Sequence, residues 1–340
     1  MKRIIQVGSI KTGPHNDISD VPGVLVGHST LIHDNIRTGV TAILPHSLGM
    51  FTHKVVASCY VANGFGKSTG LVQIEECSTI ETPILLTNTL SVGLVADGLV
   101  RYMVEENPNI GRSQSTVNPV VCECNDGRLN DIQQIVCDEH VVREALSNAT
   151  SPIIQGSVGA GAGMVCHGLK GGIGSNSRQF ELDGKTYTLG VLVNSNFGHS
   201  QGKDLIVKGK AMGPIIAPVI ARGETDQGSI IVVVATDVGL DAKSIGRVLK
   251  RVSIGIGRTG SYMGHGSGDV FIGFSTANLA TEDTIFRPMM VLNDSHINIL
   301  FQSVVEAVEE AIYQSMLLSP AVKGYRTSVH SLTEWATELP

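Results

Sequence analysis

Residues 187–198 read YTLGVLVNSNFG, and this stretch decides both the fold and the position of the candidate site. Positions 188–193 are almost continuously apolar, which is typical of a strand whose two faces are both covered. The strand runs straight into Asn194, Ser195 and Asn196 without an ordinary surface turn. Polar groups at the inner end of a buried strand cost free energy unless they are paired, so Ser195 requires an explanation.

Two interpretations fit this junction. In the first, Asn194 and Ser195 satisfy the end of the strand and Asn196 caps the next segment of the chain. In the second, the Ser195 hydroxyl attacks the Asn194 carbonyl carbon, and water then releases a new chain that begins at Ser195. The freed α-amino group has a reference pKa of about 7.7–8.0, so near neutral pH it can act as the base for its own hydroxyl. This second interpretation needs no histidine.

The rest of the chain shows the same pattern of buried strands, with amphipathic helices between some of them. Apolar runs predict strands at 24–26, 40–44, 84–87, 119–124, 165–167, 188–193, 229–235 and 270–274. Apolar residues at helical spacing predict helices at 90–105, 241–256 and 297–317. Strands covered on both faces by helices indicate a layered α/β sandwich, and the tail after Ser319 is expected to be a surface extension.

Composition excludes several classes of function. The chain has 340 residues and a formal net charge of -6 with no cluster of Lys and Arg, so a nucleic-acid partner is not expected. The longest clean apolar run, 230–235, is far shorter than the roughly 20 residues that span a bilayer, so no membrane partner is expected either. The six cysteines include no CxxC pair, which favours free thiols over a metal site. We therefore expect a soluble cytoplasmic protein without a bound metal.

Ordered sequence blocks along nearly the whole chain resemble those of the DmpA-like peptidases. This family includes the β-peptidyl aminopeptidases and the L-aminopeptidase/D-amidase/esterases. Besides residues 187–198, the blocks are NDISDVPGVLVGHST (16–30), RTGVTAILPH (37–46), GLVQIEE (70–76), ETPILLTNTLSVG (81–93), ECNDGRLNDI (123–132), SVGAGAGMVCHGLKGGIGSNSR (157–178), GSIIVVVATD (228–237) and GRTGSYMGHGSGDVFIGFSTAN (257–278).

The resemblance implies a single catalytic domain, residues 1–340, made as an inactive precursor. Cleavage between Asn194 and Ser195 would give an α chain of residues 1–194 and a β chain of residues 195–340, with Ser195 as the N-terminal nucleophile. The implied fold is a four-layer αββα sandwich whose connectivity is shared with ornithine acetyltransferase. Family members typically form tetramers of αβ units. They act on short peptides, amides or esters with a free N-terminal amine, and they use no metal or organic cofactor.

The resemblance also suggests supporting residues for the nucleophile. An acidic residue near Asp237 interacts with the nucleophile's ammonium group in the family, although an Asp at this position can also simply end the strand. Some members carry a Ser two positions earlier, where this chain has Ala235. Thr236 is a possible substitute for that hydroxyl.

Three further residues are candidates for contacts with substrate. Arg128 stands where many members have a Tyr, so it can stabilise an oxyanion, bind a substrate carboxylate, or lie in a solvated loop. Asn176 is the candidate amide of the oxyanion site. Glu76 is a candidate for holding the substrate ammonium group, with a solvated surface carboxylate as its other interpretation.

Two alternatives to a self-cleaving aminopeptidase stay open at this stage. One is an acyltransferase related to ornithine acetyltransferase, although such enzymes normally use Thr as the nucleophile. The other is a relative that neither cleaves itself nor catalyses a reaction, because Arg128 and Ala235 depart from the family pattern.

Overall fold

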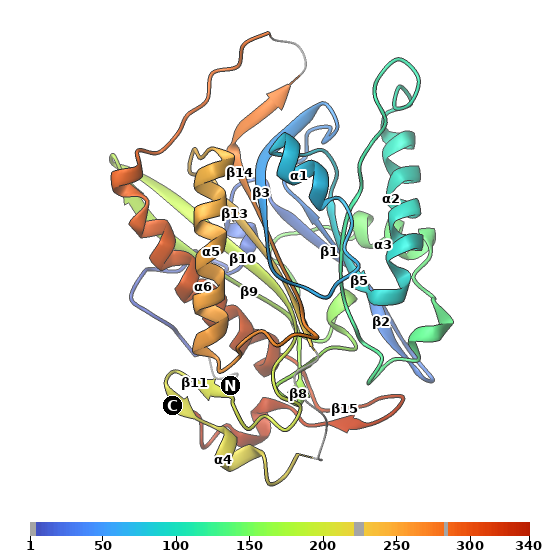
Figure 1. The fold of residues 1–340 in the computed structure, drawn as a ribbon, viewed down its shortest axis with the longest axis vertical. Helices are drawn as coiled ribbons and strands as arrows, with labels where there is room; N and C mark the ends of the chain where they lie inside the picture. Colours follow the sequence, from blue (N-terminus) through green and yellow to red (C-terminus); the bar gives the residue numbers. More distant parts are fainter. Residues whose placement is uncertain (1–4, 221–227, 282–284) are drawn as a thin grey trace.

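Two β-sheets face each other at the centre of the protein, and pairs of helices cover their outer sides (Figure 1). The computed structural model describes residues 5–220, 228–281 and 285–340. The four layers follow the order helices, sheet, sheet, helices, so the αββα sandwich predicted from the resemblance is confirmed.

The larger sheet has six strands in the order β4-β3-β14-β13-β10-β9. These strands are β4 (Thr79–Ile80), β3 (His53–Gly64), β14 (Gly268–Thr281), β13 (Ser229–Thr236), β10 (Lys185–Asn196) and β9 (Gly172–Leu182). The central strand β13 is buried along its whole length, as its continuously apolar sequence predicts.

The smaller sheet has four strands in the order β1-β2-β5-β6. They are β1 (Leu25–His33), β2 (Ile36–Leu44), β5 (Ile84–Asn88) and β6 (Val120–Cys124). Short two-stranded ribbons lie outside the main sheets: β7 (Val165–Cys166) with β8 (Leu169–Lys170), β11 (Ile206–Val207) with β12 (Lys210–Ala211), and β15 (Val322–Lys323) with β16 (Ser328–Val329).

Helices pack on the outer faces of both sheets. α5 (Ala242–Arg258) and α6 (Asn298–Leu317) cover the six-stranded sheet, and α2 (Val92–Glu106) and α3 (Glu139–Ser147) lie beside the smaller one (Figure 1). Two shorter helices, α1 (Leu71–Cys77) and α4 (Gly213–Ile216), complete the set in the described ranges. One apolar core fills the space beneath α5 and α6, and a second fills the space between the sheets.

The three predicted helices correspond to α2, α5 and α6, with ends that differ by no more than two residues. Three acidic side chains of α6, those of Glu306, Glu309 and Glu310, are buried. They are paired there, because Arg178 contacts Glu306 and Glu310 while Arg258 contacts Glu309. In the three described segments, no helix has the length and apolarity needed to cross a membrane.

Candidate active site

Ser195 lies near the end of β10, where it pairs with Gly172 of β9 on one side and Ile230 of β13 on the other. Its side chain is fully buried, and its Oγ lies 2.5 Å from the Oγ of Ser315 on α6. The Ser315 hydroxyl donates to the Ile312 carbonyl at 2.7 Å. Since a hydroxyl has one proton to donate, Ser315 accepts from Ser195. The backbone N–H of Gly172 donates weakly to the Ser195 Oγ at 3.4 Å.

The carbonyl oxygen of Asn194 points toward a buried thiol. The Cys124 thiol donates to this oxygen across 3.6 Å, from the last position of β6 in the opposite sheet. Burial raises the pKa of Cys124 well above its ordinary value, so the sulfur keeps its proton and remains a donor. Cys124 was not predicted as a site residue, because its position opposite Asn194 depends on how the two sheets face each other.

The Asn194 side chain is buried without a partner. Neither the Nδ2 nor the Oδ1 atom of this amide has a hydrogen bond among the described residues. A buried polar group left unpaired costs about 1–3 kcal/mol. The intact strand therefore carries an unfavourable group at the bond where cleavage is predicted.

A fully buried lysine fixes the loop beside Ser195. The Lys170 Nζ donates to the carbonyl oxygens of Gly161, Met164 and Gly171, at 3.0, 3.1 and 2.8 Å. Burial lowers its pKa to about 7. Gly171 packs so closely on the strand that an added Cβ would lie 2.2 Å from the Ser195 carbonyl oxygen. The sequence offered one signal for this role, namely a lysine inside an otherwise apolar and glycine-rich block.

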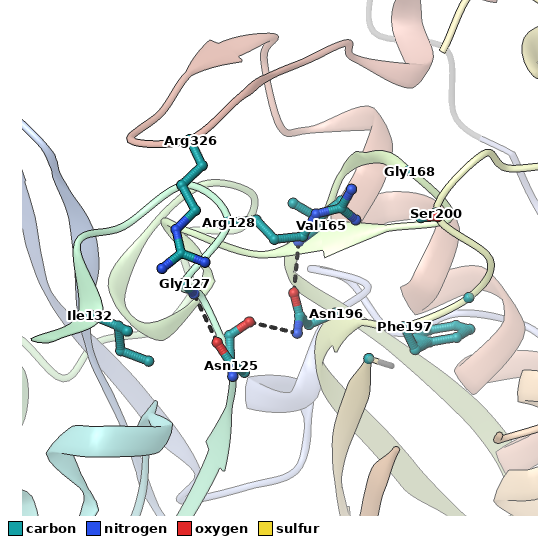
Figure 2. A pocket seen from close by; sticks show the side chains of 12 residues that line it. Asn125, Gly127, Arg128, Ile132, Val165, Gly168, Asn196, Phe197, Ser200 and Arg326 are labelled. Carbon is teal, nitrogen blue, oxygen red and sulfur yellow. Dashed lines mark hydrogen bonds between the residues drawn. The ribbon is translucent and has the colours of Figure 1, made fainter. Parts of the chain in front are cut away.

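A cavity of about 500 Å³ opens beside Asn196 (Figure 2). The two residues after Ser195 in the chain, Asn196 and Phe197, line it. The Asn196 side chain holds two walls together, accepting from the Val165 N–H at 2.9 Å and donating to the Asn125 carbonyl at 3.0 Å. The other lining residues are Gly127, Arg128, Ile132, Gly168, Gly198, Ser200, Gly228 and Arg326.

Arg128 is the predicted substrate contact that the structure brings to this cavity. Desolvation of its guanidinium lowers the pKa of the group. Sequence reasoning missed the second arginine of the cavity, Arg326, because the tail after Ser319 was expected to be a surface extension. The tail instead returns across the molecule, and the Arg326 N–H donates to the Arg128 carbonyl at 3.2 Å.

The structure does not bring Asp237 or Thr236 to Ser195. Thr236 pairs with Leu189, whereas Ser195 pairs with Ile230, so Asp237 lies seven positions along the chain from Ile230, roughly 20 Å away. Asp237 instead accepts the Thr188 N–H at 2.7 Å, and burial raises its pKa. The predicted role of Asp237 is therefore corrected: its carboxylate supports the opposite end of β10.

Asn176 and Glu76 also lie elsewhere. Asn176 is four residues along β9 from Gly172, roughly 13 Å, and its amide donates to Glu310 at 3.0 Å within the buried network around Arg178. Glu76 is exposed on α1, which packs against β3 and is not part of the cavity. Neither side chain is in a position to contact a substrate at Ser195.

The acidic residue that the sheet places in line with Ser195 is Asp269. Ser195 pairs with Ile230, and Ile230 pairs with Asp269 on β14, so two strand spacings, roughly 10 Å, separate the Cα atoms of Ser195 and Asp269. Asp269 is buried and accepts the Ser267 hydroxyl at 2.6 Å. A sequence cannot reveal this alignment, because it depends on the order and register of three strands.

The described segments contain no group of three or more His, Cys, Asp or Glu side chains that could hold a metal ion. The polar groups around Ser195 are hydroxyls, a thiol and backbone amides. Such groups can position a nucleophile and stabilise an oxyanion, which is the chemistry of acyl transfer.

Comparisons with known proteins agree with this chemistry. The sequence model of peptidase family S58 matches residues 16–330. β-Peptidyl aminopeptidase BapA of Sphingosinicella microcystinivorans is 36% identical over 338 residues, which span 92% of this chain and 84% of the relative. A crystal structure of a protein from Pyrococcus horikoshii OT3 superposes with a TM-score of 0.94 at 43% identity, covering 98% of this chain and 96% of that one.

A second solved structure is the L-aminopeptidase D-Ala-esterase/amidase of Ochrobactrum anthropi, a prototype of the serine aminopeptidases with a variant of the Ntn hydrolase fold. It superposes with a TM-score of 0.88 at 36% identity, covering 96% of this chain and 94% of that one.

Proposed function

Since the chain belongs to peptidase family S58 and is a serine aminopeptidase of the N-terminal-nucleophile type, we propose that Ser195 is its nucleophile. We further propose that the chain cuts itself between Asn194 and Ser195, giving fragments of residues 1–194 and 195–340. The observation that carries this proposal is the Ser195 hydroxyl, which is buried and held by Ser315 beside the carbonyl of a residue whose own side chain is unpaired.

Self-cleavage would begin with attack of the Ser195 Oγ on the Asn194 carbonyl carbon. The C–N bond breaks, the nitrogen of Ser195 takes up the hydroxyl proton, and an ester joins the two parts. Water then hydrolyses the ester, leaving a carboxylate on Asn194 and a free amine on Ser195. The Cys124 thiol, 3.6 Å from the Asn194 oxygen, is placed to stabilise the negative charge that develops there.

Turnover would use the freed α-amine of Ser195 as the general base. The amine takes the Oγ proton as the hydroxyl attacks the substrate carbonyl, and it returns the proton to the leaving amine. Water then attacks the acyl-enzyme. The α-amine takes the proton of the water and returns it to the Ser195 Oγ as the ester bond breaks. We assign to Asp269 the support of the protonated amine, in place of Asp237, because the strand register aligns Asp269 with Ser195.

Substrates of this enzyme would be short peptides, amino-acid amides or esters with a free N-terminal amine. The names of the relatives support this class, since they describe a β-peptidyl aminopeptidase and an L-aminopeptidase with D-Ala-esterase/amidase activity. The cavity beside Asn196 would receive the substrate, with Arg128 at its wall.

Assembly of the cleaved units into a homo-oligomer, a tetramer of αβ pairs in the cytoplasm, is part of the proposal. Ile285 and Phe286 support it, because their side chains are 95% and 89% exposed and large apolar groups are usually covered. The six free cysteines suit a reducing compartment. Light scattering of the purified protein measures the oligomeric state directly.

Denaturing electrophoresis tests the cleavage. The wild-type protein should give two fragments of 194 and 146 residues (340 − 194), and Edman sequencing of the smaller one should begin at Ser195. A Ser195→Ala variant should remain a single 36.0 kDa species and hydrolyse no aminoacyl p-nitroanilide. A wild-type protein that stays intact yet folded would contradict the proposal. Transfer of acetyl from acetyl-ornithine to glutamate would favour the acyltransferase alternative.

A further inference from the structure

The C-terminal tail completes the wall of the cavity beside Ser195. Its β15–β16 hairpin returns to the loop after β6, where the Tyr325 N–H donates to the Leu129 carbonyl at 2.9 Å and the Arg326 N–H donates to the Arg128 carbonyl at 3.2 Å. Gly324 packs so closely that an added Cβ would lie 2.5 Å from the Leu129 Cα. These contacts fix the positions of Arg128 and Arg326 relative to each other, although about 200 residues separate them in the sequence.

Both guanidinium groups at this wall are available to a ligand. Both arginines are exposed, and neither side chain has an ion-pair or hydrogen-bond partner among the described residues. None of the described residues that line the cavity is Asp or Glu. Two like charges at one wall repel each other, and desolvation already lowers the pKa of Arg128. An anion bound at this wall would offset the repulsion.

The chemistry of the cavity favours a carboxylate on a small molecule. Guanidinium groups bind carboxylates through paired N–H donors, and two of them can fix one carboxylate in a single orientation. A volume of about 500 Å³ falls within the range typical of small-ligand sites. A net charge of -6 argues against an extended polyanion as the ligand.

The cavity also lies within one residue of the proposed nucleophile, since Asn196 and Phe197 line it directly. In the view of Figure 2 the Arg128 side chain is directed toward Val165, while the Arg326 side chain is directed toward Gly127. A dipeptide whose scissile carbonyl is at Ser195 has its terminal carboxylate one residue farther on. An acidic side chain on the residue after the scissile bond lies at a similar distance.

We propose that Arg128 and Arg326 form a carboxylate site that selects substrates with a negative charge on the residue after the scissile bond. The charge can come from the free C-terminus of a dipeptide or from an acidic side chain. This inference rests on the function proposed above, because it assumes that the cavity receives the leaving side of the substrate.

The test compares short substrates that carry this charge with one that lacks it. Alanyl-alanine carries a free carboxylate, alanyl-alaninamide carries none, and the α-amide of alanyl-aspartic acid carries an acidic side chain without a free C-terminus. The wild-type enzyme should have a kcat/KM for one or both charged substrates about tenfold or more above that of alanyl-alaninamide, because hydrogen bonds to charged groups contribute about 1.5–3 kcal/mol. The charged substrate with the higher kcat/KM shows whether the site binds a free C-terminus or an acidic side chain.

Variants separate this site from general effects of charge. The ratio of charged to neutral kcat/KM should fall toward one in Arg128→Gln combined with Arg326→Gln, and partly in each single variant. Arg112→Gln, an exposed arginine away from the cavity, should keep the wild-type ratio. Self-cleavage of every variant serves as the check on folding. An unchanged ratio in the double variant, or no preference in the wild type, would overturn the inference.

The inference and the proposed function can fail separately. If the wild-type enzyme cleaves itself and hydrolyses all three substrates equally, only the carboxylate site is wrong. If the protein hydrolyses none of them, calorimetric titration with alanyl-alanine still tests the site. Binding that weakens about tenfold in the double variant would support the site without the activity, and binding that is absent or unchanged would refute it.

Discussion

The hydroxyl groups of Ser195 and Ser315 lie 2.5 Å apart, with Ser315 accepting the Ser195 proton because its own proton goes to the Ile312 carbonyl. This bond ties the end of β10 to α6 in the uncut chain. It holds the Ser195 oxygen in one orientation before any amine is available to act as a base. The helix therefore positions the proposed nucleophile for its first reaction, which is cleavage of its own chain.

Removal of this contact should slow self-cleavage. In Ser315→Ala, the Ser195 hydroxyl loses its short acceptor and keeps only the Gly172 carbonyl at 3.4 Å, so it can rotate away from the Asn194 carbonyl. One hydrogen bond contributes about 1 kcal/mol, so the rate of cleavage should fall between about threefold and tenfold. Gel densitometry of freshly translated protein gives the rate. Ser303→Ala is the matched control, because Ser303 is a buried serine of the same helix whose hydroxyl has no partner among the described residues. Equal rates in both variants would contradict the positioning role.

Asp269, and not Asp237, should govern the activity of the cleaved enzyme. A carboxylate near the Ser195 amine raises the pKa of that amine, so Asp269→Asn should lower it. Since the amine must be neutral to act as a base, the acidic limb of the kcat/KM profile should move to lower pH, by about one unit. The profile of p-nitroanilide hydrolysis measures this shift. Asp237→Asn is the control, because Asp237 contacts Thr188 at the other end of β10. A shift in the Asp237 variant alone would favour Asp237 as the partner of the amine.

The contrast between these two carboxylates shows what the sequence could predict and what it could not. The strand at 188–193 was predicted because its apolar run is a local signal, and it corresponds to β10. Which acidic residue lies beside Ser195 depends on the register of β10 with β13 and of β13 with β14. Pairing between distant strands leaves no local trace, and the resemblance to the family pointed to Asp237, which lies at the other end of β10.

Buried polar side chains explain a second group of missed features. β9 was not predicted as a strand, because Ser175, Asn176, Ser177 and Arg178 give it the appearance of a surface segment. All four are buried, and the glutamates of α6 pair with Arg178. Each half of this network is polar in sequence, and its burial depends on pairing with the other half. Arg326 was missed for a related reason, because the contacts that return the tail to Arg128 are between backbone groups and show no residue preference.

Lys170 should be required for both folding and cleavage. Lys170→Met removes three donors and leaves the carbonyls of Gly161, Met164 and Gly171 without this partner in a buried place. Each carbonyl keeps one other donor, namely the N–H of Met164, the N–H of Gly171 or the Ser319 hydroxyl. Each lost hydrogen bond contributes about 0.5–1.5 kcal/mol, so the variant should lose a few kcal/mol of stability and cleave more slowly. Urea unfolding in a Ser195→Ala background measures the stability of the uncut chain. Lys243→Met, an exposed residue of α5, is the control and should unfold as the parent does. A fully cleaved and stable Lys170→Met protein would show that the loop holds its shape without this cation.

His167 should make the protein sensitive to mild acid. Its ring is fully buried against Phe197, at 5.1 Å between ring centroids, and neither ring nitrogen has a hydrogen-bond partner among the described residues. Burial, with a smaller contribution from His199, lowers its pKa from 6.5 to about 3. Between these two pH values the unfolded chain binds a proton that the folded chain does not. The contribution of His167 to stability is therefore complete above pH 6.5 and is lost as the pH falls toward 3.

Substitution of His167 should remove its contribution to the pH dependence of the free energy of unfolding. Both His167→Phe and His167→Leu lack the titrating group, while only the Phe variant keeps an aromatic ring against Phe197. In a Ser195→Ala background, the free energy of unfolding in urea should fall with decreasing pH less steeply in both variants than in the parent, by up to about 1.4 kcal/mol per pH unit between pH 6 and 4. A change in slope confined to the Leu variant would trace the effect to packing. Equal slopes in all three proteins would contradict this prediction. They would mean that His167 takes up its proton while the protein is still folded, through local opening of the chain around the ring.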